Sequence, residues 1–230
     1  LYHYTFHGPG ACDLTWVSLP AVVPVTKYFY LGVPLFFVIS GFVIAYSAHG
    51  RSVREFAVAR VSRIYPGFLL CMTLTYLIVA MFGDSRLGVT AIQWAANLII
   101  VAPALKQPYM DLVYWSIVVE VVFYALAASA IAFGLFARRL PLVVTAWLAV
   151  SVLNEMVLNS EVVRRILITN YSGFFSSGIM LYGLFRGQRG VVGWCFGLAI
   201  IVGALQVEWN ADWLRERDVE LSHFVVPLLG

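Results

Sequence analysis

Long apolar segments separated by short polar loops dominate this chain. Crossing a bilayer as a helix takes about twenty apolar residues. The segments that meet this length lie near 28–48, 66–83, 110–136, 141–158, 166–186 and 191–208, and weaker ones lie near 89–103 and at both chain ends. We therefore predict an all-α fold, a polytopic bundle of transmembrane helices, with about eight hydrophobic segments in this fragment and about ten in the full protein.

Composition supports this interpretation. Of the 230 residues 61% are hydrophobic and 12% charged, whereas soluble domains are about 45–50% apolar and about 25% charged. The net charge is only +3, and the basic residues lie between apolar segments, which argues against a nucleic-acid partner. Cys12, Cys71 and Cys195 are far apart and lack metal-ligand spacing, so neither a disulfide framework nor a metal site is predicted.

Both chain ends fall within apolar sequence. Leu1 lies in what reads as the end of a helix, and the chain stops at Gly230 just as another apolar segment begins. We therefore expect a single transmembrane domain over 1–230 that is truncated at both ends.

The segment 51–65 combines basic and apolar residues and precedes Pro66, a pattern typical of a short interfacial helix that ends near the proline. It is the most basic loop between spans, which places it in the cytoplasm by the positive-inside rule. Its arginines are Arg51, Arg54, Arg60 and Arg63.

The topology beyond this loop depends on 89–103, which is short for a span and carries two amide side chains. If this segment crosses the membrane, the arginines in 138–139 and 186–189 lie outside. If it re-enters, those in 164–165 and 215–217 do. The two counts are nearly balanced, so the pattern alone leaves both topologies open.

One carboxylate lies inside a predicted span. Ser116, Glu120 and Tyr124 recur at helical spacing and form one polar stripe on an otherwise apolar helix. An ionised carboxylate at the bilayer centre costs about 2.5–3.5 kcal/mol, so the stripe is expected to face the bundle interior. Glu120 is thus a candidate site residue, although a carboxylate that only hydrogen-bonds a neighbouring helix gives the same pattern.

His3 is a candidate general base, since imidazole titrates near neutral pH and commonly removes a proton from a hydroxyl. An interfacial histidine without a catalytic role is the alternative, and His7 could serve in its place. Arg60 and Arg63 are three apart on a helix and project from one face, with a geometry that suits phosphate. Basic residues that only set topology or contact lipid headgroups are the alternative for this pair.

Small residues predict close helix packing at two places. Gly41 follows Ser40 in one span and permits close approach of a second helix. In another span Asn170, Gly173 and Ser177 share a face, as a tight helix contact or a small polar cavity would require.

Four blocks of the chain, 1–4, 32–42, 60–66 and 114–124, resemble the acyltransferase-3 family of integral membrane O-acyltransferases, and 171–182 is a weaker match. The four read Leu-Tyr-His-Tyr, Gly-Val-Pro-Leu-Phe-Phe-Val-Ile-Ser-Gly-Phe, Arg-Val-Ser-Arg-Ile-Tyr-Pro and Tyr-Trp-Ser-Ile-Val-Val-Glu-Val-Val-Phe-Tyr. Ile117 replaces the family's usual leucine, and the family's arginine before the histidine would precede residue 1.

The resemblance implies that an acyl group, commonly acetyl, passes from acyl-CoA on the cytoplasmic side to a hydroxyl of a sugar or another cell-envelope or exported acceptor. It implies a bacterial cytoplasmic membrane as the location, with His3 as the base, Glu120 orienting it or holding the acceptor, and Arg60 and Arg63 binding CoA phosphates. Direct transfer and transfer through an acyl-histidine both remain compatible. Further residues expected to bind substrate or shape the site are Ser40, Trp115, Ser116, Tyr124 and Asn170.

The competing function is a proton-coupled transporter or exporter of a glycan or metabolite, in which Glu120 and His3 would relay protons. Transporters often contain two related halves. The segments 28–83 and 141–208 show no such similarity, which favours the enzyme.

Overall fold

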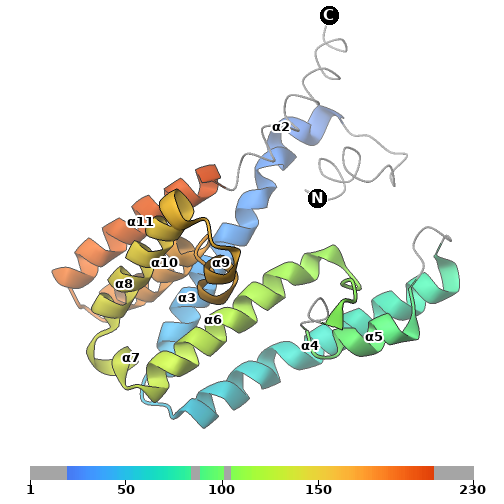
Figure 1. The fold of residues 1–230 in the computed structure, drawn as a ribbon, viewed down its shortest axis with the longest axis horizontal. Helices are drawn as coiled ribbons and strands as arrows, with labels where there is room; N and C mark the ends of the chain where they lie inside the picture. Colours follow the sequence, from blue (N-terminus) through green and yellow to red (C-terminus); the bar gives the residue numbers. More distant parts are fainter. Residues whose placement is uncertain (1–19, 84–88, 101–104, 210–230) are drawn as a thin grey trace, which may run out of the picture.

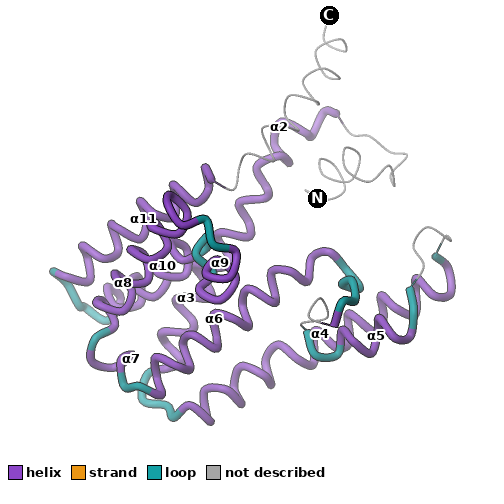
Figure 2. The backbone as a smooth tube through the Cα atoms, in the orientation of Figure 1, coloured by secondary structure: helices purple, strands orange, loops and turns teal. Residues whose placement is uncertain are grey.

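The computed structural model describes residues 20–83, 89–100 and 105–209, and every regular element in this part is a helix (Figure 2). The α-helices are α2 (Val23–Thr26), α3 (Gly32–Ala48), α4 (Val53–Phe82), α5 (Ala91–Asn97), α6 (Trp115–Ala132), α7 (Leu135–Arg138), α8 (Leu140–Leu153), α9 (Glu161–Leu167), α10 (Ser172–Phe185) and α11 (Val191–Trp209). Short 3-10 turns cover Pro20–Val22, Lys27–Leu31 and Leu112–Tyr114, and a π-helical turn, Asn154–Leu158, extends α8. The predicted all-α fold is confirmed.

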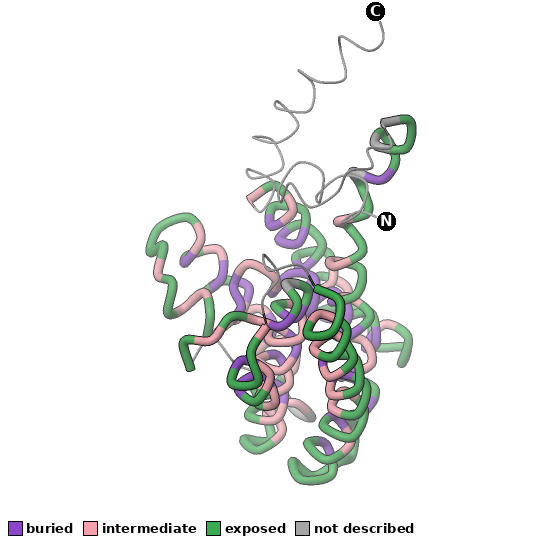
Figure 3. Tube along the Cα trace, turned by 90° about the vertical axis from the view of Figure 1, so that its right-hand side faces the viewer, coloured by how far each residue is buried: buried purple, intermediate pink, exposed green. Residues whose placement is uncertain are grey.

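Five stretches of the described residues are long and apolar enough to cross a membrane: Pro24–Ala48, Val53–Phe82, Trp115–Ala132, Leu140–Leu158 and Val191–Trp209. Exposed residues follow the outer faces of the helices (Figure 3). Many of them are large and apolar, and the exposed fraction reaches 83% for Trp194 and 80% for Phe82. Such a surface would drive aggregation in water, whereas lipid tails solvate it. The chain is a polytopic integral membrane protein.

Helix α10 is the centre of the bundle. It contacts α3, α8 and α11, and its residues from Ser172 to Met180 are all buried. Helix α6 contacts α3 on one side and α4 on the other, so it joins this group to the α4–α5 pair (Figure 1). The side chains that α6 directs to its two neighbours form the site described below.

Glycines let these helices approach closely. A Cβ added at Gly41 of α3 or at Gly178 of α10 would overlap a backbone carbonyl oxygen of the facing helix, that of Phe175 or Val38 respectively. Gly173 is held in the same way against Gly203 of α11. The close packing predicted at Gly41 is confirmed, and Gly173 makes a tight helix contact of the predicted kind. Asn170 lies in the turn before α10 and does not share the helical face of Gly173 and Ser177.

Replacing Gly178 by alanine should therefore destabilise the bundle. The new methyl group would meet backbone rather than a movable side chain, and overpacking of this kind costs about 1–3 kcal/mol. Gly193→Ala is the matched control, because a Cβ at Gly193 meets open space. Thermal unfolding of the purified protein in detergent should show a lower midpoint for Gly178→Ala than for Gly193→Ala, and equal midpoints would contradict the packing.

Two predicted boundaries are wrong. Helix α4 begins at a capping box, in which Ser52 Oγ accepts from Glu55 N at 3.3 Å and Glu55 Oε2 accepts from Ser52 N at 2.9 Å, and it continues through Pro66 to Phe82. Continuing past a proline leaves one carbonyl without its partner, whereas ending the helix in the bilayer would leave several. The segment 166–186 is interrupted by Ile168, which adopts a left-handed conformation with φ 43° between α9 and α10.

Helix α5 has seven residues and is therefore about 10 Å long, too short to cross a bilayer of about 30 Å. The chain then turns back, since Asn97 Nδ2 donates to Pro108 O at 3.0 Å and Asn97 Oδ1 accepts from Met110 N at 3.2 Å. Of the two topologies left open by the sequence, the structure therefore favours re-entry.

Re-entry places four exposed arginines of the loops at one end of the bundle, whereas Arg165 in α9 is exposed at the other. Helix α3 runs parallel to α10, because Phe37 packs on Phe175 and Phe42 on Tyr182. The loops after α3, α6 and α10 consequently lie at the same end (Figure 1). Exposed arginines in these loops are Arg51, Arg139, Arg186 and Arg189. The positive-inside rule predicts that this end is cytoplasmic and that the end with α5 and α9 is extracytoplasmic.

Single cysteines should report this topology in a background in which Cys12, Cys71 and Cys195 have been replaced. We expect a membrane-impermeant maleimide added to intact cells to label Val162→Cys in α9 and to label Gln188→Cys only after the membrane is opened. Both parent residues are exposed. Labelling of Gln188→Cys in intact cells, with Val162→Cys protected, would reverse the orientation.

Candidate functional site

A hydrogen-bonded cluster joins α3 to α6 inside the bundle. Glu120 is 7% exposed, and its Oε1 accepts from Ser40 Oγ at 2.9 Å and from the Tyr124 hydroxyl. Ser40 precedes Gly41, whose close contact with α10 holds this part of α3 in place. Among the described residues Oε2 has no hydrogen-bond donor, so one oxygen of the carboxylate is still able to accept.

Arg60 of α4 lies beside this cluster. Its Cζ is 5.9 Å from the ring centroids of both Phe56 and Tyr124, and the residue is 8% exposed. Within the described part of the chain, its Nε and Nη1 atoms are buried without a hydrogen-bond partner. A buried guanidinium with unsatisfied donors is costly, and an anionic ligand would satisfy it. Tyr124 links the two groups, with its ring near Arg60 and its hydroxyl on Glu120.

A cavity of about 240 Å³ separates α4 from α6 at Arg60. Small side chains on the two facing stripes, Ala57 on α4 and Ala125 and Ala128 on α6, leave this space. The cavity is lined by Phe56, Ala57, Arg60, Val61, Ile64, Tyr65, Ile100, Val121, Tyr124, Ala125 and Ala128. It suits a mainly apolar ligand with one anionic group.

The two arginines of the predicted pair differ. Arg60 is buried in the cavity wall, whereas Arg63, three residues later, is exposed and does not line the cavity. Their guanidinium groups therefore meet different surroundings, although the spacing on the helix is the same as expected.

The remaining predicted site residues lie toward the end of the bundle with α9, which is predicted to be extracytoplasmic. Trp115 packs with Phe37 and Tyr171, with ring centroids 6.5 and 5.7 Å away, and is 37% exposed. Ser116 Oγ donates to Val113 O at 3.0 Å, and Asn170 is half-buried next to Tyr171. His3 and the alternative base His7 lie outside the described residues.

Sequence reasoning missed part of this site. Phe56 is 1% exposed and forms one wall against Arg60. Its position four residues before Arg60 on a predicted helix is a signal that could have found it, since residues at this spacing share a helix face. The alanines at 125 and 128 beside the Glu120 stripe are a second signal, since they indicate a helix face that leaves room.

A separate polar network connects α8, α9, α10 and α11 at the end of the bundle with α9. Glu155 Oε1 accepts from Thr169 Oγ1 at 2.6 Å, and its Oε2 pairs with Arg164 Nη2 at 3.0 Å. The hydrogen bond that Arg164 donates to Glu155 raises the pKa of Arg164, so this guanidinium stays charged at neutral pH. Buried Gln206 of α11 extends the network by donating to Thr169 O at 2.6 Å. These bonds hold the turn that leads into α10.

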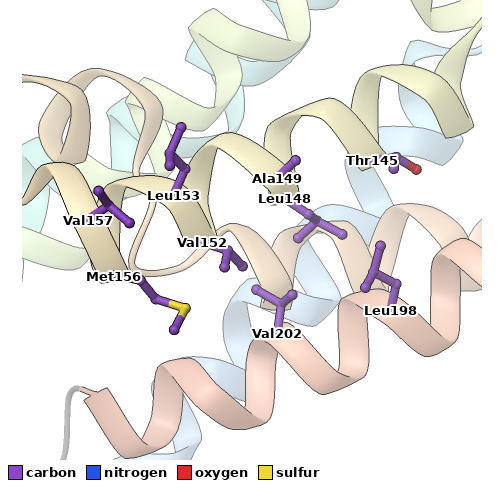
Figure 4. Close-up of a pocket in the computed structure, with 9 residues that line it drawn as sticks. All are labelled: Thr145, Leu148, Ala149, Val152, Leu153, Met156, Val157, Leu198 and Val202. Carbon is purple, nitrogen blue, oxygen red and sulfur yellow. The ribbon is translucent and has the colours of Figure 1, made fainter.

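A larger groove of about 490 Å³ runs between α8 and α11 (Figure 4). Its only polar side chain is Thr145, and the others are Leu148, Ala149, Val152, Leu153, Met156, Val157, Leu198 and Val202. Without a titratable group it cannot carry acid–base chemistry. Its apolar lining within spanning helices suits lipid tails, so the smaller cavity at Arg60 is the candidate active site.

Comparison with known protein families identifies the family of this chain and the class of reaction. A family model for an acyltransferase domain matches residues 1–226. This chain belongs to the acyltransferase-3 family. The resemblance in the four sequence blocks is thereby confirmed, and the acyltransferase-3 chain is an enzyme that transfers acyl groups in a membrane. No curated protein and no solved structure matches it.

Proposed function

We propose that this acyltransferase lies in a bacterial cytoplasmic membrane and moves an acyl group from acyl-CoA on the cytoplasmic side to a hydroxyl of an acceptor. The acyl group is acetyl, and the acceptor is a sugar or another cell-envelope or exported molecule. The observation that carries this proposal is the buried guanidinium of Arg60, which has unsatisfied donors. It lies over the ring of Tyr124, a member of the Ser40–Glu120–Tyr124 cluster. One end of the site can bind an anion, and the other holds a carboxylate with an accepting oxygen.

The donor side follows from charge. CoA carries phosphate groups, and arginine forks bind phosphate through two parallel hydrogen bonds. Arg60 lies in the first turns of α4, near the basic cytoplasmic end, with Arg54 and Arg63 exposed on the same helix. Arg60 would hold the anionic part at the cavity, and Arg63 would add charge at its edge.

The acceptor side follows from the position of Glu120. The aromatic cluster of Trp115 and Tyr171 lies between Glu120 and the extracytoplasmic end, as does Asn170. An exported acceptor would approach from this side. Glu120 Oε2 could then accept a hydrogen bond from an acceptor hydroxyl or from an imidazole.

In the reaction, His3 would take the proton of the acceptor hydroxyl as its oxygen bonds to the acyl carbonyl carbon. The carbon–sulfur bond breaks, and the imidazolium returns the proton to the departing thiolate, so the products are an ester and a free thiol. Acyl-CoA supplies the activated thioester. Glu120 would orient His3 or the acceptor, and transfer through an acyl-histidine would use the same residues.

The test is transfer from labelled acetyl-CoA in inverted membrane vesicles. We expect label in the glycan fraction with wild type, and a rate about 10²–10⁴-fold lower with His3→Ala, the usual contribution of a general base. His7→Ala is the matched control and should remain active. Full activity of His3→Ala would remove this histidine from the chemistry, and no transfer by wild type from any acyl-CoA would contradict the proposed donor.

A further inference from the structure

The cavity at Arg60 is open on one side. Three of its lining residues, Ala57 and Val61 of α4 and Ala125 of α6, are exposed, and the exposed fraction of Val61 is 61%. Both helices are long and apolar enough to cross the membrane. Within the described part of the chain, the space between them is therefore accessible from the bilayer.

Arg60 lies at the level of the lipid headgroups. Helix α4 has no charged residue from Ile64 to Phe82, a length of about 28 Å that matches a hydrocarbon core of about 30 Å. Arg63 and Arg60 precede this stretch, so they lie at one edge of the core. The positive-inside rule predicts that this edge belongs to the cytoplasmic leaflet, which is the leaflet rich in anionic lipids.

The lining of the cavity matches a phospholipid in charge and polarity. Arg60 is 8% exposed, and its Nε and Nη1 have no partner among the described residues. The two lining hydroxyls already donate elsewhere, Tyr65 to Leu98 O at 2.8 Å and Tyr124 to Glu120. The other lining side chains are apolar. One buried cation on an apolar surface suits a phosphate that is attached to a hydrocarbon chain.

We infer that this opening binds an anionic phospholipid of the surrounding leaflet, with the phosphate at Arg60 and one acyl chain leaving past Val61 and Ala125. Basic pockets between spanning helices on the cytoplasmic side bind anionic lipid headgroups in this way.

The size of the cavity agrees with this ligand. A volume of about 240 Å³ holds on the order of eight groups of about 30 Å³ each. That is room for a phosphate and the first carbons attached to it, and the rest of the lipid lies outside along α4 and α6. The inference goes beyond the proposed function, because it concerns the enzyme before acyl-CoA arrives. Acyl-CoA would then displace the lipid from Arg60.

The test is photo-crosslinking of the purified full chain in phosphatidylcholine nanodiscs. The probe is phosphatidylglycerol with a diazirine on the first carbons of one acyl chain, added in increasing fractions, and adducts are mapped to peptides. Phosphatidylcholine with the same diazirine is the comparison lipid. We expect saturable adducts on cavity-lining residues, with a half-saturating fraction at least about fivefold lower for the anionic probe.

Two pairs of variants locate the lipid. Arg60→Gln should raise the half-saturating fraction of the anionic probe at least about tenfold, and Arg54→Gln, at an exposed position outside the cavity, less than about threefold. Ala125→Phe fills the opening and should abolish saturable labelling. Ser129→Phe, one turn away on α6 and outside the lining, should not. Ala125 and Ser129 are both exposed, so both variants should fold.

Three results would overturn the inference: equal labelling by the two lipids, equal effects of Arg54→Gln and Arg60→Gln, or saturable labelling that survives in Ala125→Phe. Inorganic phosphate that suppresses labelling as strongly as unlabelled phosphatidylglycerol would also overturn it, since the ligand would then be free phosphate. If the lipid labels as expected but CoA does not displace it, the inference stands and the proposed binding of the donor at Arg60 is wrong.

Discussion

Replacing Arg60 by glutamine should raise the Michaelis constant for acyl-CoA by about 10- to 150-fold. The substitution removes the charge of a guanidinium whose Nε and Nη1 are buried and unsatisfied within the described protein. Hydrogen bonds to charged groups contribute about 1.5–3 kcal/mol, and about 1.4 kcal/mol corresponds to a tenfold change in affinity. Because the bound phosphate is distant from the breaking bond, the constant should change more than kcat.

Matched arginines on the same helix provide the controls. Arg54→Gln changes the same charge at an exposed position near the start of α4 and should alter the Michaelis constant less than threefold, as expected for a solvated charge. Arg63→Gln should fall between the two variants. Arg60→Lys keeps the charge but loses the planar guanidinium that donates two parallel hydrogen bonds, so it should recover only part of the affinity for acyl-CoA. Equal effects of Arg54→Gln and Arg60→Gln would mean that these arginines act only through the overall charge of the cytoplasmic end.

Replacing Glu120 by glutamine should lower kcat by about 10²–10³-fold, because the amide preserves the shape but not the charge that orients an imidazole or an acceptor hydroxyl. The amide oxygen can still accept from Ser40 and Tyr124, so the thermal midpoint should change little. Activity and thermal unfolding measured on the same preparation check both statements.

Ser40→Ala and Tyr124→Phe separate the carboxylate from its donors. Each removes one hydroxyl from Oε1 and leaves the charge of Glu120 in place, so each should reduce kcat by only about tenfold. If Glu120→Gln keeps the wild-type kcat, Glu120 has only the structural role of hydrogen-bonding α6 to α3, which is the alternative stated for an intramembrane carboxylate.

The sequence predicts the parts of this site that depend on one helix. Helical spacing placed Glu120 and Tyr124 on one stripe, and the cost of burying a carboxylate in lipid directed that stripe inward. Gly41 predicted close packing because a missing Cβ has a direct steric consequence. Each inference needs only local geometry and the nature of the solvent.

The parts that depend on two segments were not predictable in the same way. A proline commonly ends a helix in water. In the bilayer, ending α4 at Pro66 would leave several unpaired backbone groups and cost more than the one hydrogen bond lost at the proline, so α4 continues. The turn-back after α5 depends on Asn97 meeting the chain at 108–110. Phe56 and Ile100 became part of the site only because α4, α5 and α6 meet there.

The central claim is that the acyl donor occupies the cavity between α4 and α6. The most direct measurement is photo-crosslinking with a CoA analogue that carries a diazirine on the pantetheine arm close to the phosphates, followed by peptide mapping. The account predicts adducts on residues lining that cavity, such as Val121 and Ala125, which excess CoA suppresses and Arg60→Gln weakens. Adducts confined to the groove between α8 and α11, at Leu198 or Val202 and insensitive to CoA, would contradict it.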